Sequence, residues 1–190
     1  MLFSKNELNN ILTDKFGIST EPIRFFQAPA RINIIGEHVD YVGGFVLPAA
    51  IDFYTKVAIR KRNDKSFLLY STQYLEIEQF DTIKPSSKNP WANYILGVMD
   101  EIQKEGFEFS GFEMVIDGNI PQGAGLSSSA SLEVVTGFAI SEIFSLHISK
   151  EKIAVIGQKA ENNFVGAKCG IMDQFIIAVG KENNCLLLNT

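Results

Sequence analysis

The chain has 190 residues, enough for one compact domain with its own hydrophobic core. Apolar residues make up 46% of the sequence and charged residues 21%, which excludes an intrinsically disordered chain. A net charge of −5 argues against a general binder of nucleic acid.

The sequence gives no indication of export or membrane insertion. The N-terminus has no signal-peptide pattern, and no stretch approaches the roughly 20 apolar residues that a transmembrane helix needs. Cys169 and Cys185 are too few for a disulfide framework and are typical of a reducing compartment. We therefore expect a cytoplasmic protein with no nucleic-acid or membrane partner; the sequence carries no signal for a particular oligomeric state.

The first part of the chain predicts one helix and then several strands. Residues 7–16 have a weak helical pattern that Gly17 ends. Apolar runs bounded by turn residues predict strands at 23–28, 31–35, 45–51, 53–61 and 67–70. A polar loop follows at residues 84–90.

The second part mixes helices and strands. Apolar spacing predicts a helix at residues 91–104, and alternation predicts a half-buried strand at 112–116. A helix running through residues 132–146 is apolar on nearly every side, which predicts burial all round. A helix at 150–163 and strands at 175–179 and 185–188 complete the prediction. Without a regular βαβ rhythm, the expected class is α+β, a mixed sheet packed with helices.

The stretch GNIPQGAGLSSSASLEVV, residues 118–135, places glycines and serines directly before this buried helix. The first N–H groups of a helix lack partners inside it and carry partial positive charge, so a phosphate there would satisfy them. Gly123 and Gly125 permit positive φ and close approach of an anion, and the serines add hydroxyls. The alternative is a flexible loop whose serine caps the helix. The spacing matches neither a Walker A loop nor a dinucleotide fingerprint.

This stretch resembles the phosphate-binding motif of the GHMP kinases. RINIIGEHVDYVGGFVLPAAI, residues 31–51, is similar to the galactokinase signature, and FVGAKCGIMDQF, residues 164–175, resembles the segment that bears the galactokinase catalytic aspartate. WANYILGV, residues 91–98, also matches. The chain departs from the family pattern at Ala30, Lys168 and Asn162, which flank the chemical groups.

The resemblance implies the GHMP kinase N-terminal domain, of the ribosomal protein S5 domain 2-like fold, across residues 1–190, with the galactose-binding signature at 28–51. It also implies that the C-terminal GHMP domain is absent from this chain, which stops inside an apolar run. We therefore expect part of a longer enzyme, and no measurable ATP turnover by this part alone. The implied reaction is ATP-dependent phosphorylation of α-D-galactose at its C1 hydroxyl, in galactose metabolism.

The resemblance implies that Asp173 faces the sugar hydroxyl as a catalytic residue, with Arg31 beside it. A carboxylate there can accept the proton or orient the nucleophile. The guanidinium, which keeps its charge, would hold Asp173 ionised and stabilise the transferring phosphoryl group. Read without the resemblance, Asp173 is a turn or helix-capping residue and Arg31 part of a surface ion pair.

By the same resemblance, galactose is bound by Glu37, His38, Asp40, Gly170 and Asp173. A polar pocket with fixed donors and acceptors rejects an epimer that leaves them unpaired. The alternatives for Glu37, His38 and Asp40 are an acidic turn or, less favoured, a metal site.

The implied ATP site consists of the loop and an aromatic residue near the adenine: Gly123, Ala124, Gly125, Leu126, Ser127, Ser128, Ser129, Ala130 and Trp91. Mg²⁺, which prefers oxygen ligands, would be held by Ser129 and Glu161. Read alone, Glu161 is equally a solvated helix residue and Trp91 a core residue. Cys169 is expected to be structural.

Two other functions stay open. One is a related sugar-1-kinase, such as an N-acetylgalactosamine kinase. The other is a non-catalytic sensor of galactose and ATP; such sensors have lost a Ser-Ala pair from the serine loop, so the intact Ser129 and Ala130 favour the enzyme.

Overall fold

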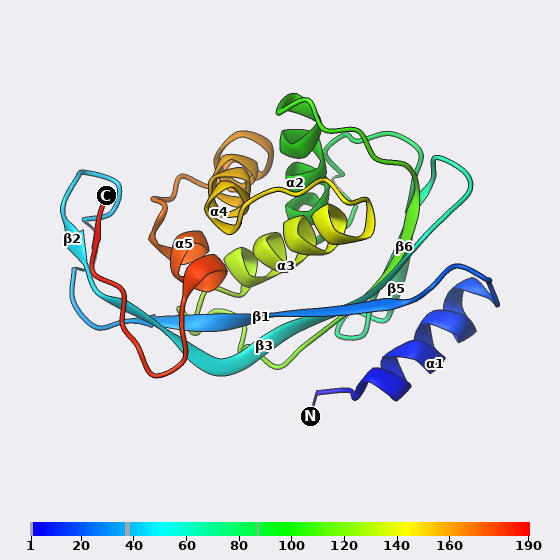
Figure 1. Cartoon of the computed structure of the whole chain (residues 1–190), viewed down its shortest axis with the longest axis horizontal. Coiled ribbons are helices and arrows are strands. Elements are labelled where there is room, and N and C mark those ends of the chain that lie inside the picture. Colours follow the sequence, from blue (N-terminus) through cyan, green and yellow to red (C-terminus); the bar gives the residue numbers. More distant parts are fainter. Residues whose placement is uncertain (1, 37–38, 87) are drawn as a thin grey trace.

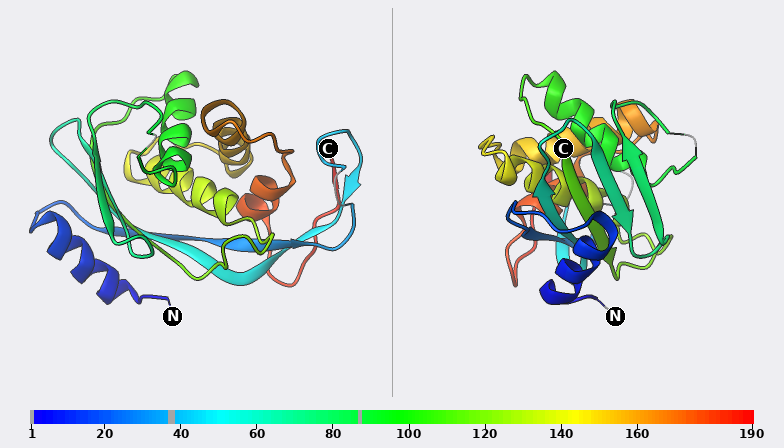
Figure 2. Two further views of the ribbon diagram at one scale, coloured as in Figure 1. Left: turned by 180° about the vertical axis from the view of Figure 1, so that it is seen from behind. Right: turned by 90° about the vertical axis from the view of Figure 1, so that its right-hand side faces the viewer.

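The structure is a computed structural model that describes residues 2–36, 39–86 and 88–190. Across these residues, a mixed five-stranded sheet has helices α2 to α5 on one face and α1 on the other (Figure 1). The views of Figure 2 show the same layers from behind and end-on. No helix within the described ranges is long and apolar enough to cross a bilayer. Glu37 and His38, two of the expected sugar ligands, lie outside the described residues.

The main sheet has the order β1-β3-β6-β4-β5, and only the β4–β6 pair is parallel. Its strands are β1 (Arg24–Asn33), β3 (Pro48–Lys61), β4 (Phe67–Ser71), β5 (Glu76–Phe80) and β6 (Phe112–Gly118). A separate pair, β2 (Phe45–Val46) and β7 (Leu188–Asn189), lies at one end of the molecule, beside the C-terminus (Figure 1). The expected α+β class is confirmed.

The helices are α1 (Lys5–Phe16), α2 (Ala92–Lys104), α3 (Ser128–Ile143), α4 (Lys150–Lys159) and α5 (Met172–Val179). A π-helical turn, η1 (Ala160–Val165), continues from α4. The prediction of one α-helix over 150–163 was therefore right for the helix but missed its change of winding.

Helix α1 begins with a capping box, in which Ser4 and Glu7 each bond the other's backbone N–H. Gly17, at φ 85°, ends it. Leu8 and Leu12 are buried against β3, β4 and β6 on the face of the sheet that lies away from the other helices. The helix therefore closes the second face of the sheet.

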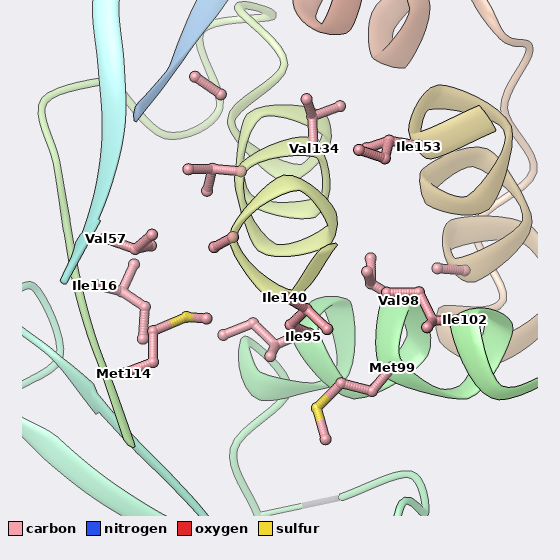
Figure 3. Close-up of a cluster of buried hydrophobic side chains, with 14 of the residues drawn as sticks. Val57, Ile95, Val98, Met99, Ile102, Met114, Ile116, Val134, Ile140 and Ile153 are labelled. Atoms are coloured by element: carbon pink, nitrogen blue, oxygen red, sulfur yellow. The ribbon is translucent and has the colours of Figure 1, made fainter. Parts of the chain in front are cut away.

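The main core lies between the sheet and helices α2, α3 and α4. Figure 3 shows Ile140 and Val134 of α3 among Ile95 and Val98 of α2 and Ile153 of α4. Val57, Met114 and Ile116 project toward these helices from the strands. Helix α3 is buried on nearly every side, as predicted.

Several strand predictions need correction. The expected strands at 23–28 and 31–35 are one strand, β1, whose pairing with β3 shifts between Pro29 and Ala30. The alternation in β6 predicted a half-buried strand, yet both of its faces are buried. Its polar side chains, Glu113 and Asp117, are buried on the face that α1 covers. Arg60 donates to Glu113, and the Thr72 hydroxyl and the Phe3 backbone N–H donate to Asp117, so both carboxylates have partners.

The prediction of a strand at residues 175–179 was wrong, because these residues form most of α5. A short apolar run that is buried on several sides does not reveal whether it is helix or strand. The expected strand at 185–188 is reduced to an isolated bridge between Ala49 and Cys185 and the two residues of β7. Strand β5 was not predicted.

Candidate active site

The glycine-serine loop joins β6 to α3 and bends through three left-handed residues. Gly123, Gly125 and Ser127 have φ of 72°, 68° and 59°. A Cβ added at either glycine would meet nothing within 4 Å, so the loop borders open space. The Ser127 side chain does not cap α3, and the first turn contains no acidic residue. The positive end of a buried helix therefore faces an open, glycine-lined surface, which favours an anion.

Arg31 and Asp173 form a bidentate ion pair beside this loop. Arg31 Nε lies 2.6 Å from Asp173 Oδ1, and Nη2 lies 2.8 Å from Oδ2. Both side chains are largely shielded, at 13% and 27% exposed. Arg31 lies just after the shift in β1, and Asp173 lies in the first turn of α5, where the helix dipole favours a carboxylate.

The ion pair is bonded directly to the loop. Arg31 Nη1 donates to the carbonyl oxygen of Gly125 at 2.6 Å, and the Ser127 hydroxyl donates to Asp173 Oδ2. Figure 1 shows α5 beside the beginning of α3. The predicted catalytic pair and the predicted phosphate loop therefore form one site, although Arg31 and Asp173 are 142 residues apart.

Asp40 and Gly170, the two expected sugar ligands within the described residues besides Asp173, are in contact. A Cβ added at Gly170 would overlap the Asp40 carboxylate. Only glycine therefore fits against Asp40 here. Gly170 is also three residues before Asp173, which places this contact next to the ion pair. The alternative metal site at His38 and Asp40 depends on a residue outside the described part of the chain.

A cavity of about 240 Å³ lies beside the first turn of α3. Trp91 lines it and stacks on Tyr74, with ring centroids 5.8 Å apart and planes 9° apart. Ser128 and Ser129 line the same cavity, so the structure brings Trp91 and the serines together. Tyr74 was missed in the sequence because it lies in the turn before β5, the strand that was not predicted.

Ser129 and Glu161, the expected Mg²⁺ ligands, lie on different elements. Ser129 lines the cavity, whereas Glu161 lies on η1. The Glu161 charge helps raise the pKa of Tyr94, another residue of the cavity wall, after the larger effect of burial. Among the described residues, both bonds that the Glu161 carboxylate accepts are at Oε2, from Gln174 and Cys169. A hydroxyl and a carboxylate with Oε1 available suit Mg²⁺, which prefers oxygen.

Behind Glu161 lies a fully buried carboxyl group, Glu133 of α3. Burial raises the pKa of Glu133 well above its usual range, the charges of Glu161 and Asp173 raise it further, and the hydrogen bond from Gln174 opposes them. Burial and Glu161 likewise raise the pKa of the Cys169 thiol, which keeps it protonated and fits a structural role. No sequence pattern distinguished Glu133 or Gln174 as part of the site.

We expect Glu133→Gln to stabilise the chain increasingly as pH rises. Because the pKa of Glu133 is higher in the folded state than in the unfolded state, the folded state keeps a proton that the unfolded state loses above about pH 4.3. The wild-type free energy of unfolding should therefore fall as pH rises from about 4.3 to the folded-state pKa of Glu133. The total fall is about 1.4 kcal/mol for each unit by which the folded-state pKa exceeds the unfolded-state pKa. Urea unfolding of both proteins between pH 4 and pH 8 measures this.

Glu7→Gln is the matched control for that experiment. Its hydrogen bonds to Ser4 lower the pKa of Glu7, so its contribution has the opposite sign and is lost as pH falls. A stability difference between Glu133→Gln and wild type that does not change with pH would contradict a neutral buried carboxyl group.

Two family models and several solved structures match the chain. The model of the GHMP kinases N terminal domain matches residues 93–181, and that of the galactokinase galactose-binding signature matches residues 12–61. The crystal structure of Lactococcus lactis galactokinase complexed with galactose superposes with a TM-score of 0.92 at 37% identity; the match covers 97% of this chain and 48% of that one.

Two more distant structures share the fold. Methanococcus jannaschii mevalonate kinase has a TM-score of 0.71 at 22% identity, over 84% of this chain and 52% of that one. A D-glycero-D-manno-heptose 1-phosphate kinase from Bacteriodes thetaiotaomicron has a TM-score of 0.73 at 22% identity, over 89% and 59%. The chain thus spans about half the length of these relatives. It belongs to the GHMP kinase superfamily, with that family's N-terminal domain and the galactokinase galactose-binding signature.

Proposed function

We propose that this domain binds ATP and α-D-galactose for transfer of the γ-phosphoryl group to the sugar's C1 hydroxyl, giving galactose 1-phosphate. The observation that carries the proposal is the bonding of the Arg31–Asp173 pair to Gly125 and Ser127 of the loop. The reaction is proposed for the protein that contains this domain, because the chain spans only 48% of the Lactococcus galactokinase. Its cytoplasmic location stays a prediction from the sequence.

The loop binds the phosphates of ATP, and the neighbouring cavity binds its adenine. The N–H groups that begin α3, with Ser127, Ser128 and Ser129, receive the phosphates at the positive end of the helix. Gly123, Ala124, Gly125, Leu126 and Ala130 complete this backbone cradle. The stacked rings of Trp91 and Tyr74 provide an aromatic wall for the adenine.

Asp173 and Arg31 act on the sugar hydroxyl and the phosphoryl group. In the structure the Asp173 carboxylate is held at both oxygens, which orients it toward the loop. The carboxylate orients the C1 hydroxyl and accepts its proton, while the guanidinium neutralises negative charge on the transferring group. Asp173 thus acts on the sugar, which accepts the phosphoryl group, and Arg31 acts on the group that ATP donates.

The sugar lies beside Asp40 and Gly170, next to Asp173, and Glu37 and His38 complete its ligands in this proposal. The galactose-binding signature at residues 12–61 and the galactose complex of the Lactococcus enzyme support this substrate. Fixed polar groups then select galactose over epimers that leave one of them unpaired.

Mg²⁺ fits the oxygen donors of Ser129 and Glu161 and would neutralise charge on the ATP phosphates. Ser129 lies in the first turn of α3 and Glu161 lies on η1, so in this proposal the hydroxyl and the carboxylate would reach the phosphates from two elements.

Calorimetry on the 190-residue chain tests the sugar site. We expect galactose to bind at least about tenfold more tightly than glucose, because a buried polar group left unpaired costs about 1–3 kcal/mol. Asp40→Ala should weaken galactose binding by about tenfold or more, whereas Asp14→Ala, an exposed aspartate of α1, should not change it.

Other outcomes would replace this function. Tighter binding of N-acetylgalactosamine than of galactose would indicate the related sugar-1-kinase. Binding of galactose and ATP without any sugar phosphate formed by the protein containing this domain would indicate a sensor. Equal binding of galactose and glucose would contradict the proposed sugar site.

A further inference from the structure

A single buried amide connects two carboxyl groups behind the proposed phosphate site. Gln174 Nε2 donates to Glu161 Oε2 at 2.7 Å and to Glu133 Oε2 at 2.9 Å. Gln174 and Glu133 are both fully buried, at 0% exposed. Glu161, in contrast, is only partly buried. The amide therefore holds the inner oxygen of a carboxylate that reaches toward the surface.

The backbone around this amide is shaped to accommodate it. A Cβ at Gly157 of α4 would lie 3.1 Å from Gln174 Cγ and 3.3 Å from Glu133 Cβ, tighter than ordinary packing. Glu161 lies on the π-helical turn η1, a winding that is common at functional sites. Its carbonyl oxygen accepts the N–H groups of Gly166 and Ala167, which closes the turn. Both the backbone and the carboxylate of Glu161 are therefore held in place.

The buried polar cluster of Glu133 and Gln174 costs more free energy than apolar side chains that filled the same part of the core. Within the described part of the chain, Glu133 Oε1 and Gln174 Oε1 are buried and have no hydrogen-bond partner. Unpaired buried polar atoms cost about 1–3 kcal/mol each, and apolar residues of similar volume would avoid that cost. The polar cluster is thus better explained by the carboxylate that it orients than by its effect on stability.

We propose that Gln174 is a positioning residue that orients the Glu161 carboxylate toward the divalent cation of bound metal–ATP, with Glu133 as the buried anchor of its amide. The proposal rests on the proposed function. Gln174 directly follows Asp173 in α5. In the same turn of this helix, Asp173 therefore bonds Arg31 and Gln174 bonds Glu161. Helix α5 thereby sets the positions of the charged groups on both sides of the phosphates.

The test compares the affinity of a non-hydrolysable ATP analogue with and without Mg²⁺, measured by calorimetry on the full 190-residue chain. In wild type, Mg²⁺ should tighten binding, and Glu161→Gln should remove that gain. Gln174→Leu should reduce the gain by about 10–100-fold, the usual effect of removing a residue that orients a metal ligand. The metal-free affinity should stay unchanged, which a general loss of structure would not allow.

Gln158→Leu is the matched control, because its amide lies in the same region but donates to the Cys169 carbonyl oxygen. Gln174→Asn, which keeps the amide but shortens its reach, serves as the second variant if Gln174→Leu does not fold. If Mg²⁺ increased the affinity of either Gln174 variant for the analogue as much as it does in wild type, the inference would be overturned. Equal losses of affinity with and without Mg²⁺ would overturn it as well. No binding of the analogue by wild type in either condition would contradict the proposed ATP site as well.

Discussion

Gly125→Asp is expected to weaken binding of an ATP analogue by about 1000-fold while leaving the fold intact. Gly125 has φ 68°, a conformation that aspartate tolerates better than most residues, and a Cβ there would meet nothing within 4 Å. The new carboxylate would stand beside the bound phosphates. Two like unit charges about 4 Å apart cost about 4 kcal/mol at an effective dielectric constant of 20, which corresponds to about three factors of ten. Calorimetric titration of the chain with the analogue measures the loss.

Gly106→Asp is the control for this substitution. Gly106 also has a positive φ, 86°, and open space around it, but it follows α2 rather than the serine loop. The two variants have the same net charge and comparable backbone cost, so their thermal stabilities should be similar and only Gly125→Asp should lose affinity. Equal affinities in the two variants would mean that the phosphates do not bind at this loop.

Glu113→Ala is expected to lower the free energy of unfolding by about 3–5 kcal/mol, the usual cost of leaving a buried charge without its partner. Arg60 Nε lies 2.5 Å from Glu113 Oε2, with side chains only 3% and 5% exposed. Arg60 also donates to the Gly17 carbonyl oxygen at 2.8 Å, which ties the end of α1 to the sheet. Urea unfolding measures the change, and faster proteolysis near α1 should accompany it.

The control for this second prediction is Glu142→Ala. Glu142 forms an ion pair with Arg24 at 2.8 Å, but both side chains are 43% exposed. Removing an exposed pair should cost less than about 1 kcal/mol. If Glu113→Ala were no more destabilising than Glu142→Ala, burial of the Arg60–Glu113 pair would not contribute to holding α1.

The elements that the sequence predicted well are those with a local cause. Helix α1 has a cap at Ser4 and a stop at Gly17, and α2 and α3 show their apolar spacing over several turns. The prediction of a strand at residues 175–179 failed because α5 is short and buried on several sides, so its apolar run carries no period that distinguishes helix from strand.

The candidate site also has one part that local sequence predicts and another that it does not. Its loop could be found in the sequence because positive-φ glycines, serines and a buried helix are adjacent in the chain. The roles expected for Asp173 and Arg31 came from resemblance, because nothing local distinguishes one aspartate or arginine from others.

By itself, the sequence determined an α+β chain with a loop of glycines and serines at the start of a buried helix, because each of these depends on residues close together in the chain. Only the tertiary structure decided that Arg31 and Asp173 are bonded to that loop, that Trp91 stacks on Tyr74 beside it, and that Gln174 joins Glu133 to Glu161. These contacts join distant segments, and their geometry depends on how the helices pack on the sheet, which no local pattern of residues encodes.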